Sequence, residues 1–133
     1  MIQEDKKLLL ADLTARSPYH VRLKVWLKDG TTEEGTLDLE HNYGDVLRDA
    51  FYYNEIIDIK PYLRPMSSMT EEEEEEYHKT MAWSGDILNE KIGIWVPTIN
   101  SSDYLIAHHF DYRGLIPKGL AIEVTEENNP YKE

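Results

Sequence analysis

The side chains best suited to chemistry lie together in residues 108–114, which read HHFDYRG. Imidazole and carboxylate groups can bind a metal ion, and a guanidinium group can bind a carboxylate or a phosphate. Adjacent residues on a helix point about 100° apart, so the two histidines do not easily hold one ion. A metal site would need His20, His41 or His78 to be brought in by folding. The candidate residues are His108, His109, Asp111, Tyr112 and Arg113.

The same segment can also be interpreted as the end of a helix. Phe110 and Tyr112 would then pack against the body, and Gly114 would adopt a left-handed cap. Asp111 and Arg113 would pair with each other or face water. The sequence favours this structural interpretation, so no catalytic, cofactor-binding or metal-binding residue is assigned, and the segment is a candidate interaction surface.

Motifs for other reactions are missing from the sequence. With no cysteine, the chain cannot form disulfides, use a catalytic thiolate or build an iron–sulfur cluster. It has neither the Gly-x-Ser-x-Gly elbow nor the Gly-x-Gly-x-x-Gly loop. The glutamates at 71–76 would fan around a helix, whereas calcium needs carboxylates that converge on one point. The sequence therefore favours a protein that is not an enzyme, and it predicts no cofactor.

Aromatic residues give a second candidate surface. The chain holds nine tyrosines and three tryptophans, and exposed Tyr and Trp side chains are favoured at protein interfaces. Trp26 falls on the polar face of its predicted strand. Tyr43, Tyr52 and Tyr53 cluster in a segment of ambiguous structure. The alternative is a second apolar layer in which a helix of the same chain covers Trp26.

The formal charge of −12 is unevenly distributed along the chain. Residues 1–64 hold 9 basic and 12 acidic residues, whereas residues 65–133 hold 5 and 14, a charge of −9 for the second half. Such a surface repels phosphate backbones, so direct nucleic-acid binding is not expected. It would suit a basic partner protein, and the simplest interpretation is solubility.

The hydrophobic pattern predicts one domain over residues 1–133 of the α+β class, with a loose tail at 126–133. We expect a small, curled, mainly antiparallel sheet of four or five short strands with two or three helices, and a barrel-like closure is left open. Ser84-Gly85-Asp86 should break the second helix, and Ser101 or Ser102 should cap the third. Helices are predicted over 5–16, from Thr70 through the glutamate run, and over 103–110; strands are predicted over 20–28, 36–40, 56–60, 92–96 and 120–124.

The chain shows no targeting or membrane signal. The apolar run at residues 8–11 is too short for a signal peptide, and nothing approaches the roughly 20 apolar residues of a membrane span. We therefore expect a cytoplasmic protein with no membrane partner.

Two stretches resemble a known group of sequences. Residues 59–73 read IKPYLRPMSSMTEEE, and residues 108–121 read HHFDYRGLIPKGLA. Together they resemble uncharacterised small proteins encoded in gut Bacteroidetes genomes, often in phage-like or mobile regions. The resemblance implies no activity, because that group has no assigned function.

Three hypotheses of function follow from the sequence. The first is a protein-interaction or accessory module of phage or mobile-element type, either binding a partner or forming homo-oligomers. The second is an acidic decoy that occupies the basic groove of a nucleic-acid-binding protein. The third is a small metal-binding protein or enzyme built around residues 108–113.

Overall fold

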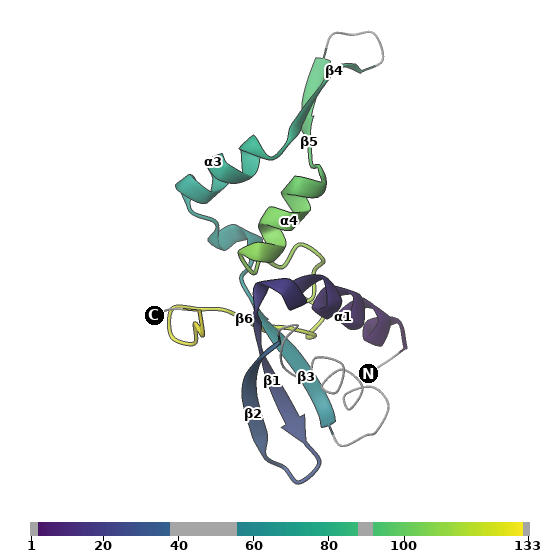
Figure 1. Cartoon of the computed structure of the whole chain (residues 1–133), viewed down its shortest axis with the longest axis vertical. Helices are drawn as coiled ribbons and strands as arrows, with labels where there is room; N and C mark the ends of the chain where they lie inside the picture. The colour runs from purple at the N-terminus through teal and green to yellow at the C-terminus, as the bar shows by residue number, and fades with distance from the viewer. Residues whose placement is uncertain (1–2, 38–55, 88–91, 132–133) are drawn as a thin grey trace.

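A four-stranded sheet and a separate two-stranded hairpin form the β-structure of the chain (Figure 1). The computed structural model describes residues 3–37, 56–87 and 92–131, and it confirms the α+β class and the mainly antiparallel sheet. The described elements are α1 (Gln3–Arg16), η1 (Ser17–Tyr19), β1 (Val21–Leu27), β2 (Thr32–Leu37), β3 (Ile56–Leu63), η2 (Met66–Ser68), α3 (Glu71–Lys79), β4 (Ala82–Ile87), β5 (Ile92–Val96), α4 (Ile99–Ala107) and β6 (Ile122–Glu123).

The larger sheet has the strand order β2-β1-β3-β6. β1 pairs antiparallel with β2 and with β3, and β3 pairs parallel with the two-residue strand β6. Among the described strands β2 and β6 are the two edges, so the sheet is open and does not close into a barrel. The last strand, predicted over 120–124 from its apolar alternation, is shorter in the structure, where β6 consists of Ile122 and Glu123.

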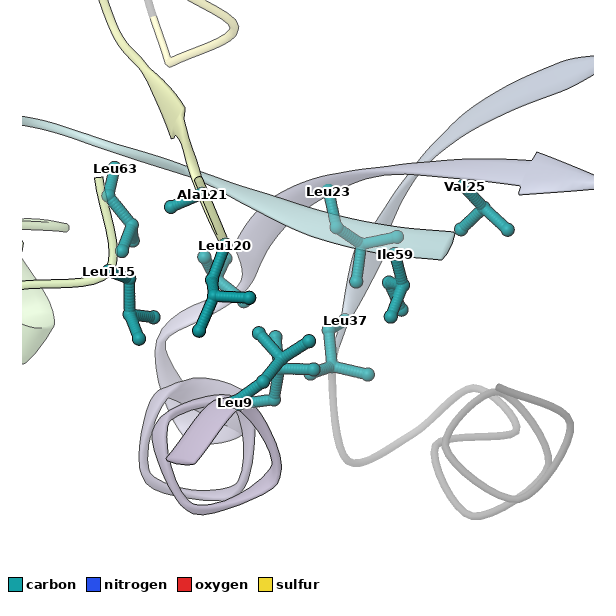
Figure 2. Close-up of a cluster of buried hydrophobic side chains, with 11 residues drawn as sticks. Leu9, Leu23, Val25, Leu37, Ile59, Leu63, Leu115, Leu120 and Ala121 are labelled. Carbon is teal, nitrogen blue, oxygen red and sulfur yellow. The ribbon is translucent and has the colours of Figure 1, made fainter. Parts of the chain in front are cut away.

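The core lies between α1 and one face of this sheet, as Figure 2 shows. β1 points Val21, Leu23 and Val25 toward α1, in the alternation that a half-buried strand requires. From α1, Leu9 and Leu13 pack into the same core; they lie one helical turn apart and are fully buried. The core cluster consists of Leu9, Leu13, Val21, Leu23, Val25, Leu37, Ile59, Leu63, Leu115, Leu120 and Ala121.

Two strand boundaries differ from the prediction. β2 begins at Thr32, because its polar residues lie on an exposed edge where no apolar pattern is needed. β3 continues through Pro61 to Leu63 instead of ending before the proline. Pro61 pairs with Leu23 of β1 on one side, but β6 pairs with β3 only from Tyr62 onward. Proline is tolerated where one side of the strand has no partner, because it has no N–H to donate there. Residues 42–53, which the sequence left ambiguous, lie outside the described residues.

The hairpin of β4 and β5 points away from the four-stranded sheet, beyond α3 and α4 (Figure 1). Its first strand includes Ser84, Gly85 and Asp86, which were predicted to break a helix, whereas that helix already ends at Lys79. Cross-strand pairing with β5 overrides the weak strand propensity of these residues.

A polar cluster fixes the base of the hairpin. α4 is capped by Thr98 and not by the predicted serines, and Ser101 completes the capping box. The Thr98 hydroxyl donates to the Thr80 carbonyl (2.8 Å), and the Thr80 hydroxyl donates to Ser101 Oγ (2.9 Å). Thr80 follows α3 and Thr98 precedes α4, so both ends of the hairpin are tied to the helices.

Tyr131, within the tail that the sequence predicts to be loose, is held against the body. The Tyr131 hydroxyl accepts the backbone N–H of Arg22 (2.9 Å) and donates to the carbonyl of Tyr62 (2.7 Å). Its ring stacks on His109 with the ring centroids 3.8 Å apart. Burial raises the pKa of the Tyr131 phenol, as expected for a hydroxyl that serves as a structural anchor.

Candidate functional site

The residues at 108–113 do not converge on one point. His108 follows the last residue of α4 and packs against Tyr104 with the rings tilted by 32°, and its Nδ1 lies 3.8 Å from a Glu73 carboxylate oxygen. His109 turns to the other side and stacks on Tyr131. Across the described residues, no group of three histidine, aspartate or glutamate side chains could hold a metal ion. His41 lies outside that part of the chain.

The charged members of this segment have structural partners. Asp111 is buried and accepts the backbone N–H groups of Leu115 and Ile116, both at 2.8 Å. Arg113 donates to Asp12 (3.2 Å) and lies over the ring of Tyr112. The segment therefore has a structural role, but α4 ends at Ala107, before the predicted end at 110. Asp111 and Arg113 were wrongly predicted to pair with each other or to face water, because each has a partner elsewhere in the fold. The geometry gives no support to a metal or catalytic centre there.

His109 combines an unusual backbone conformation with a buried ring. Its φ of 66° is left-handed, a conformation that costs a non-glycine residue about 1–2 kcal/mol. Its carbonyl accepts the backbone N–H of Arg64 (2.7 Å), and its buried Nδ1 has no partner among the described residues. Burial, followed by the charge of Arg16, lowers the pKa of His109 to about 4. A polar hollow of about 710 Å³ opens beside it, lined also by Arg64, Thr125 and Asn129.

Arg64 and Glu73 join the sheet to α3. Two guanidinium nitrogens of Arg64 donate to the two Glu73 carboxylate oxygens (2.7 and 2.8 Å), and the guanidinium lies 4.1 Å above the ring of Phe110. Glu73 also accepts from the Thr70 backbone in the predicted capping box. The hydrogen bonds from Arg64, ahead of those from Thr70, hold the pKa of Glu73 at about 2.

Glu73→Gln should lower the free energy of unfolding by about 1 kcal/mol at pH 7, the loss expected for a forked, partly exposed ion pair. The pKa of Glu73 is lowered by folding from 4.5 to about 2, so its contribution is complete above 4.5 and is lost as the pH falls toward 2. Urea unfolding at several pH values should show the two proteins converging in acid. A constant difference across this range would contradict the assignment.

Trp26 lies on the sheet face opposite α1 and is half-buried. The ammonium groups of Lys24 and Lys60 lie 5.4 and 5.6 Å from its ring. Thus two lysines of the same chain flank the ring, an arrangement that a cation–π interaction favours. Trp26 also lines a hollow of about 370 Å³ with Asp58 and Gly30. Tyr43, Tyr52 and Tyr53, proposed from the sequence to join this surface, lie outside the described residues.

The hairpin carries an aromatic surface that the sequence did not single out. Trp83 and Trp95 are opposite each other across β4 and β5, with ring centroids 5.3 Å apart in an edge-to-face arrangement. Their exposed fractions are 57% and 47%. The ring of His78 in α3 packs edge-on against the ring of Trp95, with the ring centroids 4.4 Å apart. We call Trp83, Trp95 and His78 the tryptophan face.

Further exposed apolar side chains surround this surface. Among the described residues six large hydrophobic side chains are exposed, and four of these fall between Trp83 and Ile99. Ile94 is half exposed and Ile99, in the first turn of α4, is 82% exposed. Clusters of this kind mark interaction sites more often than single exposed residues do. The projecting hairpin and the start of α4 are therefore the strongest candidate surface in the described structure.

Helix α3 divides its glutamates between two faces. Glu73 binds Arg64, and Glu76 accepts a hydrogen bond from the Tyr104 hydroxyl (2.8 Å), so these two face the body. The opposite face borders an open hollow of about 810 Å³. That hollow is lined by Glu71, Glu74, Glu75, His78 and Lys79. Since His78 also contacts Trp95, this acidic face adjoins the tryptophan face.

Comparisons of the chain with protein-family models, with curated proteins and with solved structures find no match. None of the described helices is long and apolar enough to cross a membrane.

Proposed function

We propose that this chain is a non-enzymatic protein-interaction module that binds its partner through the tryptophan face. The observation that carries the proposal is the exposure of Trp83 and Trp95, 57% and 47%, on a hairpin that projects from the body (Figure 1). Covering an aromatic side chain removes on the order of 150–250 Å² of surface from water. Tryptophan is also among the residues that most often dominate binding energy at interfaces.

The setting of the hairpin supports this role. A two-stranded hairpin by itself is at best marginally stable in water. Here Thr80, Thr98 and Ser101 tie its base to α3 and α4, and His78 packs against Trp95. The tryptophans are thus presented in a fixed position, which reduces the entropy lost on binding.

The proposal retains two predictions from the sequence. An accessory role of phage or mobile-element type rests on the resemblance of residues 59–73 and 108–121. A cytoplasmic location is retained because a chain without cysteine suits a reducing compartment. The diverging side chains at 108–113 favour an interaction module over an enzyme or a metal-binding protein.

Random peptides displayed on yeast can test whether the tryptophan face binds polypeptide. We expect peptides that are enriched on the wild-type chain and lost on the Trp83→Ala/Trp95→Ala variant. The matched control is Leu10→Ala/Met66→Ala, which removes two exposed apolar side chains of α1 and η2. Circular dichroism would establish that both variants are folded. Enrichment that is absent, or that survives the loss of both tryptophans, would refute the proposed function.

A further inference from the structure

We infer that the partner of the tryptophan face is a lysine- or arginine-rich polypeptide segment; this inference rests on the proposed function. The aromatic surface supplies the docking site, and the acidic face of α3 beside it determines the class of partner. Together they form one surface, because His78 belongs to the acidic face and contacts Trp95.

The charges along this surface favour a cation. Glu71, Glu74 and Glu75 are exposed, and no cation of the described residues pairs with their carboxylates. Glu73 is different, since Arg64 already neutralises it. Lys79 is a positive charge on the same face, so the three glutamates leave a net negative surface. A basic segment would provide the missing counter-charges.

The tryptophans favour the same partner. Indole is the best aromatic host for a lysine or arginine side chain. Trp26 illustrates this within the chain, because Lys24 and Lys60 lie near its ring. No described cation lies over Trp83 or Trp95. About half of each tryptophan side chain is exposed, so a cation from outside can reach the rings.

The same charges disfavour other occupants. A second copy would bring a chain of formal charge −12 against another, with its own glutamate-rich α3. Nucleic acid and anionic lipid surfaces carry phosphate groups, which Glu71, Glu74 and Glu75 would repel. A basic polypeptide combines the aromatic contact with charge complementarity, and it should associate faster at low salt.

Fluorescence anisotropy with labelled synthetic peptides tests the inference on the full chain. The basic probe alternates arginine with glycine, and matched probes carry glutamine or glutamate in place of arginine. We expect the basic probe to bind at least about tenfold more tightly than the glutamine probe. Its affinity should fall as salt rises from about 50 to about 300 mM.

Two sets of variants locate the binding. Glu71→Gln/Glu74→Gln/Glu75→Gln should weaken binding of the basic probe about tenfold without disturbing the hairpin. The matched control Glu4→Gln/Glu126→Gln/Glu127→Gln changes net charge equally at exposed sites elsewhere, and should alter affinity less than about twofold. Trp83→Ala/Trp95→Ala should also weaken binding about tenfold.

Each contrary result overturns a defined part of the inference. Equal weakening by both glutamine triples would show binding to bulk charge and not to this face. Tighter binding of the glutamine or glutamate probe, still lost in Trp83→Ala/Trp95→Ala, would refute the basic partner but keep the proposed function. Sedimentation showing a dimer that the same double variant dissociates would make a second copy the occupant. No tryptophan-dependent binding of any probe, together with no enriched displayed peptide, would refute both.

Discussion

Asp12→Ala is expected to lower the free energy of unfolding by about 3–5 kcal/mol, because it leaves a buried arginine without its counter-charge. Asp12 and Arg16 are both fully buried, and Arg16 Nε donates to Asp12 Oδ2 at 2.7 Å. Arg113 donates to the other carboxylate oxygen, and Arg16 Nη2 donates to the Phe110 carbonyl (2.6 Å). Asp12 and Arg16 thus connect α1 to Phe110 and Arg113.

Urea unfolding followed by circular dichroism measures this loss. Glu4→Ala, which removes an exposed carboxylate from the same helix, should change stability by less than about 0.5 kcal/mol. Asp12→Leu/Arg16→Met removes both buried charges and should recover much of the loss, since apolar residues of similar volume often replace buried pairs well. If Asp12→Ala cost no more than Glu4→Ala, the charge network would not be important for stability.

The sequence predicted correctly those elements that are determined by residues close together in the chain. The alternation of Val21, Leu23 and Val25 predicted β1, and the pair of Thr70 and Glu73 predicted the start of α3. β4 was missed because Ser84, Gly85 and Asp86 have weak strand propensity and become a strand only through pairing with β5. Tertiary pairing, which has no local signal, set that boundary.

In the candidate sites too, local sequence predicted some features, and others depend on contacts between distant residues. Arg113 reaches Asp12 across 101 residues of sequence, so its partner could not be read from its neighbours. Trp95 gave one usable signal, since it lies on the opposite side of its strand from Ile94 and Val96. Its pairing with Trp83 depends on the register of the hairpin. The sequence did not predict that hairpin, because residues 84–86 were interpreted as a break and not as a strand.

The stability of the protein is expected to fall as the pH drops from about 6.5 to about 4, because His109 is buried in its neutral form. Its pKa is lowered from 6.5 to about 4 by folding, chiefly through burial. Between these values the unfolded chain binds the proton and the folded chain does not, so acid favours unfolding. The contribution is complete above 6.5, and its loss by pH 4 should reach roughly 2 kcal/mol.

His109→Phe keeps an aromatic ring against Tyr131 but cannot titrate, so its unfolding free energy should change less over this range. Any cost of the left-handed φ at position 109 would be constant with pH and would not affect the comparison. Tyr131→Ala should raise the pKa of His109 toward its ordinary value, because the stacked ring that buries it is gone. NMR titration of the His109 ring protons would measure that shift directly. A wild-type midpoint near 6.5, or equal pH dependence in His109→Phe, would show that His109 is not the group whose burial sets the acid sensitivity.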